Sequence, residues 1–251
     1  MKKDIYTEEF LINMGPQHPS THGVLSLECR LDGEIVMDCT PHLGYLHRSM
    51  EKIAENRTYT QFIPFTDRLD YVASMNNNLG FCLAAEKLLQ VPVPPRAQSL
   101  RVIVAELNRV ASHLLGISTF AQDLGAFATP LFYAMRDRHK IVEIFDEICG
   151  QRLTYNYVRI GGVSGDLPLG IDQRIRDFVR QEREMLKEYD DLLTHNVIFK
   201  ARSKGIGILS KDVALAYGVT GPSLRASGFK LDLRKDEPYL GYDKFDFEVP
   251  V

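Results

Sequence analysis

One apolar stripe in the middle of the chain most constrains the fold. Apolar residues recur there at alternating spacings of three and four, at Leu100, Ile103, Leu107, Val110, Leu114, Ile117, Ala121 and Leu124. This spacing puts the side chains on one face of an α-helix more than three heptads long. Pro94 or Pro95 suits its first turn and Gly125 its end. We predict the packing spine of a helical bundle. A coiled-coil dimer is less favoured, because further helical segments flank the stripe.

Helical patterns continue on both sides of this spine. We expect helices over residues 48–59, from a cap at Asp67 to about Gln90, from about Pro130 to Ile148, from about Ile171 to Leu193, and over 211–217. Residues 158–170 are too rich in glycine for a helix and are predicted to form a loop.

The N-terminal part has a different pattern. The stretch VLSLECRLDGEIVMDC, residues 24–39, predicts a β-hairpin that turns at Asp32-Gly33. The sequence therefore predicts an α+β fold, with a small β element in residues 1–45 and a helical bundle in residues 46–218. Residues 219–251 are expected to be an extended segment that leads into a missing C-terminal part.

Bulk properties exclude some classes of protein. A net charge of −3 gives no basic excess for binding nucleic acid. No apolar run reaches 18 residues, and the N-terminus lacks the apolar stretch of a signal peptide, so we expect a cytoplasmic location. The four cysteines are far apart and form no CxxC pair, so they are a poor ligand set for zinc or an iron–sulfur cluster. We expect buried thiols and no bound metal.

Two histidines stand in the stretch MGPQHPSTHG, residues 14–23. Pro16 and Pro19 disfavour a helix there, so His18 and His22 are expected on a loop ahead of the hairpin. A loop histidine is usually just exposed. The four-residue spacing suits a metal site on a helix, but Pro19 lies between the two, so a metal site is not favoured.

Three further polar groups are candidates for chemistry. Arg68 and Tyr71, in DRLDY, lie one helical turn apart and hence on one face of a helix, and Asp123 is an acid beside the apolar stripe near the end of the long helix. The third is the pair His47 and Arg48 in LHR. Taken singly, each also fits a structural role, as a cap, a solvated charge or a core tyrosine with its hydroxyl satisfied.

Long motifs then appear in a family-specific order. They are GPQHPSTHGV, DCTPHLGYLHRSMEKIAENRTY, DRLDYVASM, VPPRAQSLRVIVAELNRVASHLL, DLGA, YVRIGGVSGDLPLG, GPSLRASG and DLRKDEPY. Over residues 15–251 the chain resembles the quinone-binding 49-kDa subunit of respiratory complex I. That family is similar to the large subunit of nickel–iron hydrogenases without its metal site, which agrees with the missing CxxC pair.

The resemblance implies roles for particular residues. His22, on the quinone loop with His18, would face the quinone headgroup, and Tyr71 would hydrogen-bond its other side. Asp123 would pair with His22 and keep it protonated. Arg48 and Arg68 would lie near the terminal iron–sulfur cluster of a neighbouring subunit and stabilise its reduced state.

The resemblance also implies a setting. The chain would be a subunit of a proton-pumping NADH-quinone oxidoreductase, and electrons would pass from the neighbouring iron–sulfur subunit to quinone. NAD and the clusters would be bound by partner subunits, and no cofactor by this chain. Its partners would be the other peripheral-arm and membrane-arm subunits, on the cytoplasmic side of the inner membrane. Because family members continue past DFEVP, we expect the isolated chain to be inactive.

Three alternatives stay open. A same-family subunit of a ferredoxin- or deazaflavin-dependent quinone oxidoreductase would carry the same motifs. A hydrogenase-like catalytic subunit would need the missing cysteines. A purely structural scaffold would not need His22, Tyr71 and Asp123.

Overall fold

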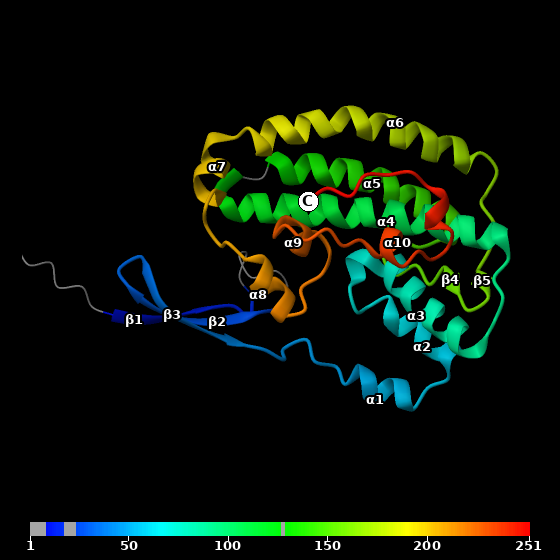
Figure 1. The fold of residues 1–251 in the computed structure, drawn as a ribbon, viewed down its shortest axis with the longest axis horizontal. Helices are drawn as coiled ribbons and strands as arrows, with labels where there is room; N and C mark the ends of the chain where they lie inside the picture. Colours follow the sequence, from blue (N-terminus) through cyan, green and yellow to red (C-terminus); the bar gives the residue numbers. More distant parts are fainter. Residues whose placement is uncertain (1–8, 18–23, 127–128) are drawn as a thin grey trace, which may run out of the picture. The chain divides into compact units, whose positions relative to one another are not determined.

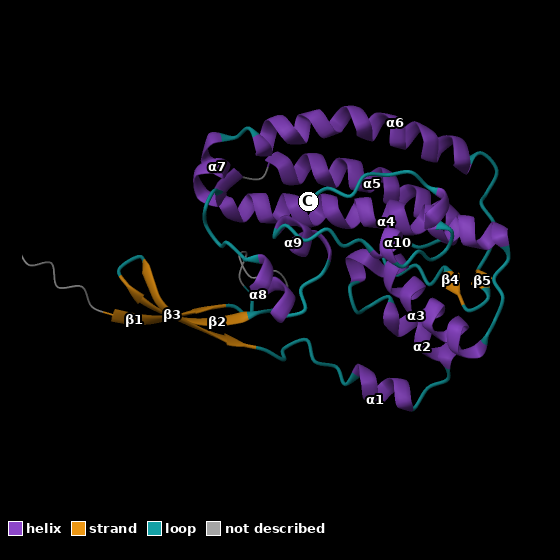
Figure 2. Ribbon diagram, in the orientation of Figure 1, coloured by secondary structure: helices purple, strands orange, loops and turns teal. Residues whose placement is uncertain are grey.

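The computed structural model describes residues 9–17, 24–126 and 129–251. The chain divides into two compact units, residues 1–56 and 57–251, called here the N-terminal unit and the helical unit. A three-stranded sheet precedes the helices, so the predicted α+β class is confirmed (Figure 2).

The N-terminal unit is built on an antiparallel sheet with the strand order β1-β2-β3. The strands are β1 (Glu9–Met14), β2 (Ser26–Asp32) and β3 (Ile35–His42), and helix α1 (Met50–Glu55) follows. The predicted hairpin is confirmed, but its turn lies one residue later. Asp32 pairs with Ile35, which leaves Gly33 and Glu34 as the turn, and Gly33 has a φ of 64°. Strand β1 was not predicted.

The helical unit has α4 (Pro95–Ala121) at its centre. Figure 1 shows α4, α5 (Thr129–Cys149) and α6 (Ile171–Tyr189) running side by side, with α5 in contact with both others. Helices α2 (Tyr59–Thr66) and α3 (Ser74–Leu89) pack on each other, and α3 also contacts α4. The core includes Met75 and Leu79 of α3 and Ile141, Ile144 and Phe145 of α5.

The residues of the apolar stripe differ in burial along α4. Its every-seventh members, Leu100, Leu107, Leu114 and Ala121, are buried. Ile103 and Val110 are half-buried at the edge of the core, and Ile117 is exposed. The helix begins at Pro95 as predicted and ends at Ala121, where residues 122–126 continue as a π-helical turn.

Two predicted details of the helical unit differ from the structure. Asp67 does not begin a helix, because α2 ends just before it and α3 starts only at Ser74. Thr58 and Gln61 form a reciprocal capping box that starts α2 earlier. The glycine-rich loop contains a short hairpin of β4 (Val158–Arg159) and β5 (Gly162–Val163). Its turn residue Gly161 has a φ of 88°, which suits glycine.

The end of the chain also differs from the prediction. After α7 (Val197–Ser203) and α8 (Lys211–Ala216), the expected extended segment contains α9 (Gly221–Ala226) and α10 (Leu233–Asp236). The side chain of Asp232 accepts the backbone N–H of Arg234 and caps α10, which explains the helical turn. Within the described ranges, no helix is long and apolar enough to span a membrane.

Candidate functional site

Tyr71 presents its ring at the surface of the helical unit. The residue opens a 3₁₀ turn, Tyr71–Ala73, and 54% of its surface is exposed. Asp70 starts this turn, because its Oδ1 accepts the backbone N–H of Val72 at 3.2 Å. Among the described residues, none hydrogen-bonds to the Tyr71 hydroxyl. The phenol can therefore donate a hydrogen bond to a ligand.

A buried asparagine of α4 fixes the position of this turn. Asn108 is fully buried, and its side chain donates to the carbonyl of Val72 at 3.1 Å. Its Oδ1 accepts the backbone N–H of Met75, at the start of α3, at 2.9 Å. One amide group thus joins the 3₁₀ turn, α3 and α4, so the exposed Tyr71 stands on rigid backbone.

Ser74 ties the same turn to a distant part of the chain. Its buried hydroxyl lies 2.9 to 3.0 Å from the carbonyl oxygens of Asp67, Tyr71 and Leu153. The hydroxyl can donate to one of these at a time. The segment around Leu153, between α5 and β4, is therefore held against the Tyr71 turn.

Arg68 lies in the turn between α2 and the 3₁₀ turn, not on a helix. Its guanidinium Nη1 donates to the carbonyl of Pro64 at 2.5 Å, at the end of α2. The prediction that Arg68 and Tyr71 share one helical face is wrong, because residues 67–70 form a turn. The short separation still places both exposed side chains on one stretch of backbone.

Asp67 is a buried acid that was not predicted as part of the site. The carboxyl is fully buried, and its Oδ1 accepts the backbone N–H of Asn156 at 3.3 Å. Burial raises the pKa of Asp67, while the nearby Arg68 lowers it. Its Oδ2 has no hydrogen-bond partner within the described part of the chain. The position of Asp67 next to Arg68 in DRLDY could have indicated a role in the site, but the local sequence pattern predicts a helix cap at Asp67.

Asp123 lies in the π-helical turn that follows α4, at the surface. This turn is fixed by Arg202 of α7, whose guanidinium donates to the carbonyl of Leu124 at 3.0 Å. Gly125 has a φ of 88°, and a Cβ there would collide with Arg202. This turn starts at Gln122, fourteen residues after Asn108, the residue that holds the Tyr71 turn. The two positions are therefore about 20 Å apart along the axis of α4.

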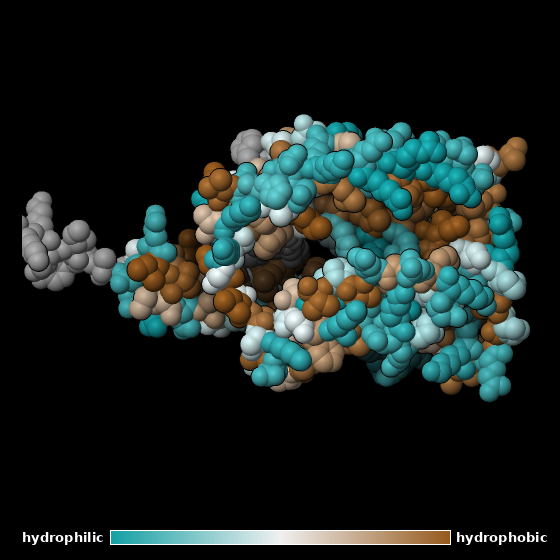
Figure 3. Space-filling view, turned by 45° about the horizontal axis from the view of Figure 1, so that its top comes forward, coloured by the Kyte–Doolittle hydropathy of each residue, from teal (hydrophilic) through white to brown (hydrophobic). Residues whose placement is uncertain are grey.

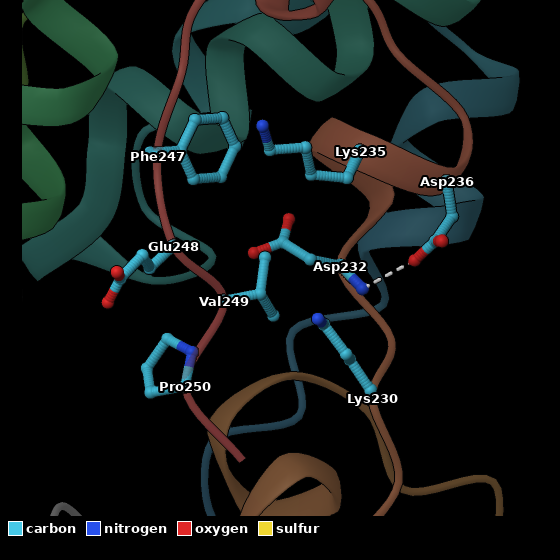
Figure 4. A pocket seen from close by; sticks show the side chains of 8 residues that line it. All are labelled: Lys230, Asp232, Lys235, Asp236, Phe247, Glu248, Val249 and Pro250. Atoms are coloured by element: carbon cyan, nitrogen blue, oxygen red, sulfur yellow. Dashed lines mark hydrogen bonds between the residues drawn. The ribbon is translucent and has the colours of Figure 1, made fainter.

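Two cavities of the helical unit lie away from these residues. An apolar groove of about 310 Å³ runs between α4 and α6, and Figure 3 shows brown apolar side chains gathered beside the polar outer face of α6. A polar pocket of about 580 Å³ lies between residues 230–236 and 247–250. Figure 4 shows the Asp232 carboxylate and two lysine side chains around this pocket. Neither cavity contains a predicted site residue.

Comparison with known proteins decides the family. Residues 123–251 match the family described as "Respiratory-chain NADH dehydrogenase, 49 Kd subunit". The chain belongs to this family. It is 56% identical over 243 residues to an NADH-quinone oxidoreductase subunit of Solibacter usitatus, covering 97% of this chain and 65% of that protein. It is 51% identical over 251 residues to the corresponding subunit of Chlorobaculum tepidum, covering 100% of this chain and 62% of that protein.

A third relative, an NADH-quinone oxidoreductase subunit of Bacillus mycoides, is 51% identical over 247 residues, covering 98% of this chain and 67% of that protein. The chain thus spans a little under two thirds of the length of the first two curated relatives. The predicted resemblance to the 49-kDa family is confirmed over the full chain.

The structure describes four of the six site residues that the resemblance implies. Tyr71 and Arg68 lie in adjoining turns, and Asp123 lies on the turn after α4. Arg48 is an exposed residue just before α1 of the N-terminal unit. His18 and His22 lie outside the described residues, between β1 and β2 in the sequence. Within the described residues, no group of three or more His, Cys, Asp or Glu side chains is arranged to hold a metal.

Proposed function

We propose that this chain forms the quinone-reduction site of an NADH-quinone oxidoreductase, together with a neighbouring iron–sulfur subunit. The observation that carries the proposal is the exposed Tyr71 on a turn fixed by the buried side chains of Asn108 and Ser74. Family membership supplies the reaction class, because the named relatives are subunits of NADH-quinone oxidoreductases.

Reduction of a quinone to a quinol takes two electrons and two protons. The Tyr71 hydroxyl would donate a hydrogen bond to one carbonyl of the headgroup, and His22 would donate to the other. An imidazole titrates near pH 6.5, so His22 can hold a proton at neutral pH when a carboxylate lies beside it. Asp123 would be that carboxylate.

The electrons would come from the terminal cluster of the partner subunit. Arg48 and Arg68 would lie near this cluster, where positive charge stabilises the reduced state. NAD and the iron–sulfur clusters would be bound by partner subunits, and proton pumping would be carried out by the membrane arm. The chain would then lie on the cytoplasmic side of the inner membrane, as a peripheral member of the complex.

Replacing Tyr71 in the assembled enzyme tests this proposal. Tyr71→Phe removes one hydroxyl and keeps the ring, so we expect assembly to be unchanged and quinone reduction to fall at least about tenfold. Tyr217→Phe is the matched control, because Tyr217 is another surface tyrosine, 84% exposed. Electron transfer from NADH to an artificial acceptor upstream of quinone should stay normal in both. Full quinone reductase activity in assembled Tyr71→Phe enzyme would refute the proposal.

A double-mutant cycle tests whether His22 and Asp123 act as a pair. The variants are His22→Ala, Asp123→Asn and both together, assayed for quinone reduction in the assembled complex. If one shared interaction holds the proton, the double variant should be little slower than the slower single variant. Losses in log rate that simply add would show that the two residues work separately.

A further inference from the structure

Two cysteines face each other across neighbouring strands of the N-terminal sheet. Cys29 of β2 pairs in register with Cys39 of β3. The side chains of such a pair lie on the same face of the sheet. Their Sγ atoms are 3.7 Å apart, with the Cys29 thiol directed at the Cys39 sulfur.

The backbone at this pair suits a covalent link. The Cys39 N–H donates to the Asp38 side chain at 2.9 Å, so it does not point at β2. Pro41, two residues along, pairs with Leu27 and has no N–H to donate. Both observations mark Cys29 and Cys39 as a non-hydrogen-bonded pair, whose Cα atoms lie about 4.5 Å apart. Disulfides span Cα separations of about 4.4 to 6.8 Å, so the sulfurs can bond without moving the strands apart.

The two thiols differ in accessibility. Cys39 is exposed, whereas Cys29 is 4% exposed. Burial raises the pKa of Cys29, and its hydrogen bond to Cys39 raises it further. An oxidant in solution therefore meets Cys39 first, and Cys29 lies within reach to complete the reaction.

We propose that Cys29 and Cys39 are a redox modification site, which closes to an intramolecular disulfide on exposure to a hydroperoxide. The Cys39 thiolate attacks one oxygen of hydrogen peroxide, the O–O bond breaks, and the released hydroxide takes up the thiol proton as water. Cys29 then attacks the sulfenic sulfur of Cys39, the S–O bond breaks, and a second water leaves with the Cys29 proton. The two thiols lose two electrons in total and the peroxide gains them.

The other two cysteines provide an internal comparison. Cys82 is fully buried in the helical unit, and burial raises its pKa to about 12. Cys149 is half-buried, and burial raises its pKa to about 11. Both thiols are less accessible than the exposed Cys39, so both should react with peroxide more slowly than Cys39.

The test uses the full chain, treated with increasing hydrogen peroxide and then with a thiol-blocking maleimide. Trypsin cuts after Arg30, between the two cysteines, so a disulfide joins peptides 4–30 and 31–48. We expect mass spectrometry to find this joined pair in the monomer, with two of the four thiols lost and both restored by dithiothreitol.

Two results would overturn the proposal. One is a Cys39 sulfinic acid with Cys29 still free for the maleimide, and the other is a dimer linked through Cys39. The exposed position of Cys39 makes Cys39→Ser the safest variant for folding, and it should abolish the joined peptides. The matched control Cys149→Ser should form them at the rate of the unaltered chain.

Discussion

Arg101 of α4 and Glu86 of α3 form a two-pronged ion pair inside the helical unit. The two nitrogen–oxygen distances are 2.9 and 2.5 Å, and the side chains are 0% and 6% exposed. The same guanidinium donates to the carbonyl of Gly162, and Glu86 accepts the backbone N–H of Gly161 at 2.7 Å. The pair therefore holds the β4–β5 hairpin against the two helices.

Removing one partner of this ion pair should lower the free energy of unfolding more than replacing both partners with apolar residues. Arg101→Met leaves the Glu86 carboxylate buried without its counter-charge, so we expect the free energy of unfolding to fall by about 3–5 kcal/mol. Combining it with Glu86→Leu removes the stranded charge and should recover a large share of the loss. Urea denaturation of the three variants measures both effects. A double variant that loses the sum of the single losses would contradict this account.

Asn108 should matter for both stability and activity. Asn108→Ala strands the N–H of Met75 and the carbonyl of Val72, which predicts a loss of about 1–3 kcal/mol in unfolding free energy. Under the function proposed above, quinone reduction in the assembled complex should also fall, although Tyr71 is unchanged. The control is Asn77→Ala, which removes one surface hydrogen bond to Asp70 and should cost less than about 1 kcal/mol. Equal effects of the two substitutions would argue against Asn108 as the anchor of the turn.

Glu182 should destabilise the helical unit at neutral pH. It is 8% exposed beside the apolar groove between α4 and α6, and neither carboxyl oxygen has a hydrogen-bond partner among the described residues. We expect Glu182→Leu to raise the free energy of unfolding by about 1–3 kcal/mol at pH 7.

The stability gained by Glu182→Leu should depend on pH. Burial, and then the nearby Asp137, raise the pKa of Glu182 in the folded state. The folded protein then holds this proton to a higher pH than the unfolded chain, so stability is lost as pH rises through the folded pKa. The advantage of Glu182→Leu should therefore be smaller at pH 4 than at pH 7. The control Glu184→Leu, at an exposed acid of the same helix, should not raise the free energy of unfolding at pH 7.

The stability that Asp232 contributes should depend on pH in the opposite direction. Hydrogen bonds from the Arg234 side chain lower the pKa of Asp232 to about 2, against the raising effect of burial. A lowered pKa adds stability above the unfolded value, near 3.9, and this stability disappears as pH falls through about 2. Asp232→Asn should thus lower the melting temperature at pH 7 and differ little from the unaltered chain near pH 2. Asp243→Asn, at an exposed acid, should have little effect at either pH.

Local sequence was enough to predict the periodic elements. The heptad spacing from Leu100 to Ala121 and the helix-starting Pro95 located α4 almost to the residue, because both act within a few turns of one helix. The alternation around Gly33 located the β2–β3 hairpin for the same reason. Long motifs identified the family, and with it the expected roles of Tyr71, Arg68 and Asp123.

The burial and the contacts of polar residues depended instead on tertiary packing. Asp67 had the local pattern of a helix cap, yet it is buried against the backbone of Asn156, 89 residues later. Arg101 is fully buried, although nothing in its local sequence pattern indicates an interior position. Its partners come from α3 and from the β4–β5 hairpin. Cys29 and Cys39 became a pair through strand register. Contacts between distant segments depend on how the elements pack, and local spacing carries no information about that packing.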